Sequence, residues 1–212
     1  ESPLAVAIPD TRQEVEALLA AARKHQVAIV TRGAGTGLSG GARPISNALL
    51  LNMTRFNRVL EIDQDNFSAR VEPGVRNLAI SEAVSHLGLY YAPDPSSQIA
   101  CTIGGNVAEN SGGVHCLKYG LTVNNILELT VLTIDGEWLT LGSASGEAPG
   151  YDLLALMTGS EGMLGIIMEI RVRLLVKPPH ARAILASFDD IERAGDAVGA
   201  IIAAGIIPAG LE

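Results

Sequence analysis

The sequence predicts an α+β fold made of two lobes. Strand-like apolar runs alternate with amphipathic helical stretches near the N-terminus, whereas strand patterns dominate after about residue 120. The clearest of these is residues 166–176, in which apolar side chains recur at every second position. Hydrophobic residues make up 48% of the 212-residue chain, which is enough to bury a sizeable core.

The N-terminal elements are predicted from short, distinct signals. Residues 3–9 read as a strand, and Thr11 with Glu14 has the spacing of a capping box. Apolar residues at helical spacing then predict a helix to about residue 25. Residues 27–31 and 48–52 read as buried strands on either side of a glycine-rich loop.

The middle of the chain continues with a mixture of strands and helices. The patterns predict, in order, a hairpin of strands 59–63 and 68–72, a helix carrying Ile80, Ala83, Val84 and Leu87, strands at 126–134 and 137–141, and a short helix at 152–158. Residues 92–124 are mostly Gly, Pro, Asn and Ser, so we expect a long functional loop there.

The C-terminal stretch begins where "KPP" at 177–179 ends the long strand. Residues 184–188 predict a new strand. Ile191, Ala194, Val198, Ile201 and Ile202 predict a helix with one apolar face. Because the other strands of such a sheet are absent from the sequence, we expect this segment to pair with another molecule, for example in a homodimer.

Glycine is concentrated in three segments, 33–41, 104–113 and 159–165, of which the first reads "TRGAGTGLSGGA" with its flanks. Gly35, Gly37 and Gly40 match G-x-G-x-x-G, but no helix can open at the last glycine as a dinucleotide fold requires. A strand–loop–strand can still hold phosphate, since backbone N–H groups form an anion-binding concavity and Arg32 adds charge. We expect Gly37 to need a positive φ.

The second and third glycine segments extend this hypothesis. Residues 92–120 combine prolines, hydroxyl side chains and a Gly-Gly-Asn run, and residues 158–167 place Glu161 just before the long strand. Three such loops favour one elongated ligand. His115 and Cys116 lie in the second segment, where packing is favoured over catalysis as their role.

The ordered motifs "RGAGTGLSGGA", "VEPGV", "PDPSSQIACTIGGNVAEN", "GGVHCLKYGLT" and "LLALMTGSEGMLGI" resemble the FAD-binding part of vanillyl-alcohol-oxidase-type flavoproteins, in the branch of D-lactate and glycolate dehydrogenases. The resemblance runs from about residue 5 to the end. It implies a two-lobed PCMH-type FAD-binding domain at 1–178, with lobes at about 1–65 and 66–178. Residues 179–212 would then begin a C-terminal substrate domain.

The resemblance also implies which residues hold the cofactor. Thr36 stands where some relatives carry a flavin-linked histidine, so we expect non-covalent FAD. The catalytic base and any metal ligands are expected outside this chain, and residues 1–212 alone are expected to be inactive. The implied cofactor-binding residues are Arg32, Gly33, Ala34, Gly35, Thr36, Gly37, Leu38, Ser39, Gly40, Gly41, Pro93, Asp94, Pro95, Ser96, Thr102, Gly104, Gly105, Asn106, Asn110, Gly112, Gly113, Tyr119, Gly120, Glu161, Gly162, Ile166 and Ile167.

Three functions remain open from the sequence. The first is FAD-dependent oxidation of a 2-hydroxy acid such as glycolate or D-lactate, with hydride passing from the α-carbon to the flavin and electrons passing on to an iron–sulfur partner subunit. The second is an NADPH-dependent reductase of the cell-wall enolpyruvate type, which "CLKYGLT" and "GSEGMLG" fit poorly. The third is a non-catalytic subunit that keeps the fold without the flavin.

Composition narrows the partners and the compartment. The formal net charge of −8 argues against nucleic-acid binding, which needs a basic surface. No apolar run reaches the length of a membrane span, and the two cysteines do not form a disulfide framework or a zinc motif. We therefore expect a cytoplasmic protein, or one that is peripheral to a membrane through its partner subunits.

Overall fold

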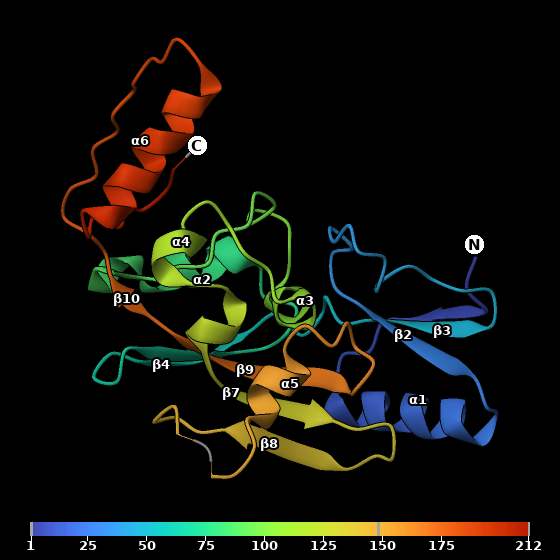
Figure 1. The fold of residues 1–212 in the computed structure, drawn as a ribbon. Helices are drawn as coiled ribbons and strands as arrows, with labels where there is room; N and C mark the ends of the chain where they lie inside the picture. The colour runs from blue at the N-terminus through green and yellow to red at the C-terminus, as the bar shows by residue number, and fades with distance from the viewer. Residues whose placement is uncertain (1, 148, 212) are drawn as a thin grey trace.

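A computed structural model describes residues 2–147 and 149–211 of the chain. The described residues form a three-stranded sheet, a five-stranded sheet and a two-stranded ribbon, with helices around them (Figure 1). Mixed helix and sheet content, with parallel and antiparallel sheets in separate parts of the chain, confirms the predicted α+β class.

The three-stranded sheet is parallel and has the order β1-β3-β2, formed by Ala5–Ala7, Ala48–Asn52 and Ala28–Arg32. Helix α1, Arg12–Lys24, connects β1 to β2 and buries Val15 and Leu19. The predicted cap is confirmed, because Thr11 Oγ1 accepts the Glu14 N–H at 3.2 Å. The Glu14 carboxylate accepts the N–H of Asp10 rather than that of Thr11, so the box is shifted by one residue.

The five-stranded sheet is antiparallel and holds the larger core. Its order is β4 (Val59–Asp63), β5 (Ser68–Val71), β9 (Ile166–Arg173), β7 (Ile126–Leu132) and β8 (Trp138–Gly142). The hairpin predicted at 59–63 and 68–72 is therefore confirmed, and the strands predicted at 126–134 and 137–141 pair with each other as β7 and β8. Strand β4 is the first strand of this sheet along the chain, so the antiparallel sheet begins at residue 59.

The long strand predicted at 166–176 is interrupted. Strand β9 ends at Arg173, and Leu174 donates its N–H to the carbonyl of Phe67 at 2.7 Å. The short strand β10, Leu175–Val176, then pairs with β6, Leu89–Tyr90, in a separate ribbon. The alternation continues through the interruption, which is why the sequence pattern shows one strand.

Helices cover the antiparallel sheet on the side of the glycine-rich loops. Helix α2 (Asn77–Val84) continues into a 3₁₀ turn at Ser85–Leu87. The short helix predicted at 152–158 is α5 (Leu153–Met157), with Asp152 as its N-cap. Residues 92–124 are not all loop as expected, since they contain α3 (Ile103–Glu109), α4 (Cys116–Tyr119) and the 3₁₀ turn at Thr122–Asn125. Packing against β9 stabilises α3 despite its two glycines.

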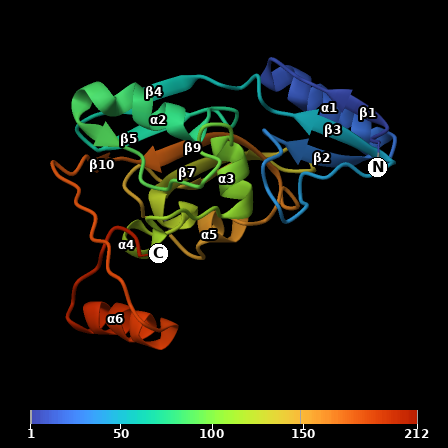
Figure 2. The same ribbon diagram turned by 90° about the horizontal axis from the view of Figure 1, so that it is seen from above.

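The C-terminal stretch projects from both sheets. Helix α6 (Ile191–Ala203) forms as predicted, has no buried residue, and stands away from the sheets in both views (Figures 1 and 2). Residues 184–188 form no strand, so that prediction is wrong. A strand needs a neighbour to pair its backbone groups, and no described strand lies beside this segment. Among the described helices, none is long and apolar enough to cross a bilayer.

The two sheets meet where Gly74 packs against the turn after β3. A Cβ on Gly74 would lie 2.6 Å from the carbonyl oxygen of Met53, 2.7 Å from that of Phe56 and 2.9 Å from that of Thr54. The N–H of Gly74 donates to Phe56 O at 2.7 Å. Backbone therefore lies directly on backbone at the junction, and only glycine permits this distance.

Replacing Gly74 with Ala should destabilise the protein by about 1–3 kcal/mol, because three carbonyl groups would have to move. Gly195→Ala is the matched control, since nothing lies within 4 Å of a Cβ there and the residue is inside α6. The control should leave stability unchanged or raise it by up to about 1 kcal/mol through helix propensity. Urea unfolding of both variants measures the difference, and equal effects would contradict this account of the junction.

Candidate functional site

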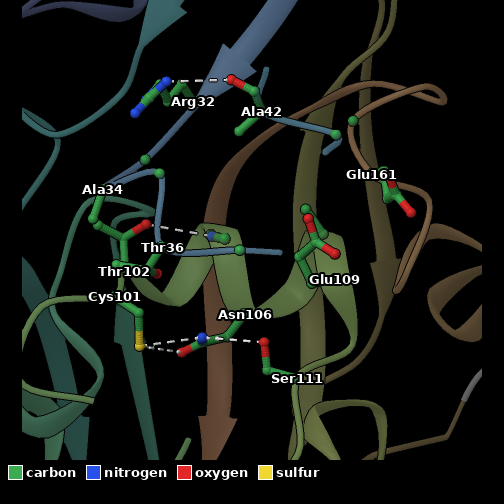
Figure 3. A pocket seen from close by; sticks show the side chains of 18 of the residues that line it. Arg32, Ala34, Thr36, Ala42, Cys101, Thr102, Asn106, Glu109, Ser111 and Glu161 are labelled. Atoms are coloured by element: carbon green, nitrogen blue, oxygen red, sulfur yellow. Dashed lines mark hydrogen bonds between the residues drawn. The ribbon is translucent and has the colours of Figure 1, made fainter. Parts of the chain in front are cut away.

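A cavity of about 400 Å³ lies between the loop after β2, the start of α3, the turn at 95–101 and the loop before β9 (Figure 3). This volume is within the range of small-molecule and cofactor sites. Most of the implied cofactor residues line it: Arg32, Gly33, Ala34, Gly35, Thr36, Gly37, Leu38, Ser39, Gly41, Pro95, Thr102, Gly104, Gly105, Asn106, Asn110, Gly112, Glu161, Gly162 and Ile167.

The loop after β2 presents a backbone that is almost free of internal hydrogen bonds. It joins the parallel neighbours β2 and β3, so it serves as their crossover connection without a helix. Within the described residues, none of the N–H groups of 34–42 donates to a protein acceptor; the loop's turn is closed only by Arg43 N–H donating to Gly40 O at 2.9 Å. Such a row of free donors is suited to an anion.

The start of α3 lies against this loop. A Cβ on Gly33 would be 2.0 Å from Thr102 Oγ1, so any side chain at position 33 would prevent the loop from lying this close to Thr102. Thr102 also begins α3, since its Oγ1 accepts the N–H of Gly105 at 3.4 Å. Gly104 packs on Pro73, and a Cβ on Gly104 would lie 2.6 Å from the Cβ of Pro73. The glycines of both segments therefore allow the backbones of the loop after β2, the start of α3 and the turn at Pro73 to pack closely together.

Arg32 closes the side of the loop nearest β3. Its guanidinium donates to Ala42 O at 3.5 Å, and a Cβ on Gly35 would be 2.2 Å from Arg32 Nη2. Gly35 has a φ of 71°, which disfavours other residues. The side chain of Arg32 thus lies across the loop, and it forms no ion pair within residues 2–147 and 149–211.

Gly37 does not have the positive φ that was predicted for it. The left-handed glycines of the loop are Gly35 and Gly40, and Gly37 is not among them. A Cβ on Gly37 would instead approach the Glu109 carboxylate, with Oε1 at 3.0 Å. The predicted need for a positive φ at Gly37 is therefore wrong. A side chain at this position would instead project into the cavity.

Two carboxylates also face the loop. Glu161 has a φ of 52°, an uncommon conformation for a residue with a side chain, and its Oε2 is 2.6 Å from a Cβ position on Gly41. Its N–H donates to Ala108 O at 2.9 Å, which fixes the loop before β9 to the end of α3. Neither Glu109 nor Glu161 has a hydrogen-bond partner for its carboxylate in the described part of the chain, so both can turn toward donors on a ligand.

Asn106 holds the floor of the cavity. Its Oδ1 accepts from Asn77 Nδ2 at 3.0 Å, and its Nδ2 lies 3.3 Å from Ser111 Oγ and 3.4 Å from Cys101 Sγ. Asn77 also donates to Pro93 O at 3.0 Å. The amide of Asn106 is buried and fully used within the protein (Figure 3), so it shapes the wall through its neighbours.

Some implied residues lie outside the lining, and their cofactor role remains a prediction. Ile166 is buried in the core around α1, Tyr119 packs edge-on to Tyr90 with centroids 6.2 Å apart, and Asp94 is paired with His115. The implied residues outside the lining are Gly40, Pro93, Asp94, Ser96, Gly113, Tyr119, Gly120 and Ile166.

The structure adds cavity residues that the sequence motifs did not single out. Glu109, the last residue of α3, and Pro73 belong to the motifs given above but were not assigned to the site, whereas Met53 and Ser111 lie outside those motifs. The added lining residues are Thr31, Ala42, Met53, Pro73, Ser97, Cys101, Ala108, Glu109, Ser111 and Gly165. Among the described residues, no group of three His, Cys, Asp or Glu side chains is placed to hold a metal ion.

A backbone cradle with free N–H groups, one arginine at its side and a long wall beyond it define the class of site: a cradle for a phosphate-containing nucleotide cofactor. The chain matches the family model described as "FAD binding domain" over residues 3–142, and it belongs to that family. FAD fits the observed residues, since its pyrophosphate could accept hydrogen bonds from the free donors at 34–42, and residues of all three glycine segments line the cavity.

Relatives and solved structures agree with this assignment. The chain is 64% identical over 210 residues to glycolate oxidase subunit GlcD of Escherichia coli (strain K12), covering 99% of this chain and 42% of the relative. It is 35% identical over 181 residues to D-lactate dehydrogenase of Anaerostipes hadrus, covering 85% and 38% of the two chains. It resembles a solved structure of alkyldihydroxyacetonephosphate synthase with a TM-score of 0.79 and 26% identity, covering 97% and 38%. The chain thus spans less than half the length of these proteins.

Gly37→Val should abolish FAD binding and change unfolding stability by less than about 1 kcal/mol, because the loop is exposed and the new side chain would fill the cavity. Gly88→Val is the control, since Gly88 has a φ of 69° and lies away from the cavity. It should cost about 1–2 kcal/mol and leave FAD binding intact. Flavin absorbance and thermal unfolding on the same samples give both values. Normal FAD content in folded Gly37→Val would show that the loop is only a structural turn.

Asn106→Leu should lower stability by about 1–3 kcal/mol, because the buried Asn77 amide would lose one of its two acceptors and keep only Pro93 O. Asn106→Asp retains the acceptor oxygens and serves as the comparison. Chemical denaturation of the two variants should rank Leu below Asp; the reverse order would contradict a role of Asn106 in holding Asn77.

Proposed function

We propose that the protein oxidises a small 2-hydroxy acid with FAD. This is the reaction class that the names of its relatives indicate, glycolate oxidase subunit GlcD and D-lactate dehydrogenase. The observation that carries this is the loop at 34–42, whose free N–H groups can hold the cofactor's pyrophosphate. Relatives at 64% and 44% identity cover 99% of the chain, which supports the same chemistry here.

The chain's own residues bind and orient the cofactor. The N–H groups after β2 and the guanidinium of Arg32 would donate hydrogen bonds to the phosphate oxygens of the cofactor. Glu161 can accept hydrogen bonds from hydroxyl groups of the cofactor. FAD supplies the hydride acceptor for the α-carbon of the substrate. Pro95, Ser97 and Cys101 line the cavity beside the start of α3 and add contact surface for the cofactor.

Substrate and partners are proposed from the relatives. The chain spans 42% of the Escherichia coli protein, and we propose that the hydroxy-acid site and the catalytic base correspond to the part of that protein that this chain does not cover. Electrons would pass to an iron–sulfur subunit of a multi-subunit oxidase. The exposed apolar side chains Ile184, Leu185 and Ile191 suit a homodimer contact. We propose a cytoplasmic location, with peripheral membrane attachment through the partner subunits.

Anaerobic titration of the full-length protein tests the function. Glycolate or D-lactate should bleach the oxidised flavin absorbance within seconds, whereas NADPH should leave it unchanged. Residues 1–212 alone should show no bleaching with either hydroxy acid. Bleaching by NADPH alone would favour a reductase, and a protein without flavin would favour a non-catalytic subunit; either result would overturn the proposal.

A further inference from the structure

Asp94 and His115 form a carboxylate–imidazole pair beside the cavity. Asp94 Oδ2 lies 2.6 Å from His115 Nδ1, and the backbone N–H of His115 donates to Asp94 Oδ1 at 3.3 Å. Both carboxylate oxygens are thus used on one residue. The side chain of Asp94 is 20% exposed and that of His115 is 43% exposed, so the pair sits at the surface with its carboxylate on the inner side.

The other ring nitrogen of His115 is left available. Nε2 has no hydrogen-bond partner among residues 2–147 and 149–211. A carboxylate on Nδ1 fixes both the orientation of an imidazole and the nitrogen it presents. Packing alone, which the sequence favoured for His115, does not require a partner for Nδ1 and an open Nε2.

The surroundings of His115 suit a flat ring with a polar edge. The ring of Tyr119 is 6.5 Å from the imidazole, Tyr90 is edge-on to Tyr119, and Lys118 Nζ lies 5.6 Å from the Tyr119 centroid. Burial and the neighbouring Tyr119 hydroxyl raise the pKa of Tyr90, so that this phenol stays neutral. Neutral aromatic faces beside a cation and an open imidazole favour a planar heteroaromatic ligand.

The pair adjoins the far wall of the cavity. Pro95 follows Asp94 and lines the cavity, as does Gly112, which precedes His115 by three residues. A Cβ on Gly113 would lie 2.4 Å from Asp94 Oδ1, so the two segments are in direct contact. In both ribbon views α4 lies on the opposite side of α3 from the glycine loop (Figures 1 and 2). A dinucleotide held by its pyrophosphate at the loop would cross the start of α3 toward His115.

We propose that His115, oriented by Asp94, binds the isoalloxazine end of FAD through Nε2. His115 is then a cofactor-binding residue and Asp94 a positioning residue that acts through it. The proposal rests on FAD binding, which the proposed function also requires, and is independent of which substrate is oxidised. It assigns the two ends of the ligand to different parts of the chain, with phosphate at 34–42 and the ring at Asp94–His115.

Binding titrations with FAD and with ADP separate the two ends. In the full-length apoprotein, His115→Gln and Asp94→Asn should each weaken FAD binding about tenfold, the effect of losing one hydrogen bond to a charged or oriented group. ADP, which lacks the ring, should bind as tightly as it does to the unchanged protein. Cys116→Ser is the matched control, because Cys116 is an exposed neighbour in α4, and it should alter neither affinity.

A spectroscopic readout distinguishes contact from a structural role. The ¹⁵N resonance of His115 Nε2 in the unsubstituted protein should move on adding FAD and stay in place with ADP. An FAD affinity within twofold of normal in His115→Gln, equal losses of FAD and ADP affinity, or a stationary Nε2 resonance would each overturn the proposal. Normal FAD results with no bleaching by a hydroxy acid would refute the proposed function alone.

Discussion

The site depends on the close approach of the loop after β2 to the start of α3. Thr102 Oγ1 lies 2.0 Å from the position that a Cβ on Gly33 would take, so the two segments touch because one has no side chain. Thr102 also caps α3 and pairs with Arg76 at the start of α2 through an isolated bridge. One threonine therefore joins the glycine loop, α3 and α2, and this contact places the open N–H groups of the loop over the cavity.

This arrangement lets an acidic chain bind an anion. The net charge is −8, and Glu109 and Glu161 face the cavity with only Arg32 as a lining cation among the described residues. A carboxylate about 4 Å from a phosphate charge costs about 4 kcal/mol at an effective dielectric of 20. Each N–H bond to a charged oxygen contributes about 1.5–3 kcal/mol, so two or three of them offset that repulsion. The carboxylates can also turn aside, whereas the donors of the backbone are fixed.

Much of the fold follows from local patterns, and the site follows from them less directly. Alternation at 166–173 and the cap at Thr11 specify their elements because neighbours in sequence decide them. Helix α3 was missed because Gly104 and Gly105 disfavour a helix in isolation, and packing on Pro73 and β9 outweighs that preference. The strand expected at 184–188 does not form because no strand of the described residues lies beside it. The glycine loop was identified by composition, but the Asp94–His115 pair joins residues 21 positions apart and appears only in three dimensions.

Amide hydrogen exchange of residues 34–42 tests the central claim most directly. Because these N–H groups have no protein acceptor within the described chain, they should exchange at nearly unprotected rates in the FAD-free protein. FAD should slow their exchange by about tenfold or more, and ADP should do the same because it carries the diphosphate. Strong protection before any ligand is added, or no gain of protection at 34–42 when FAD is bound, would contradict the account of this loop as the phosphate cradle.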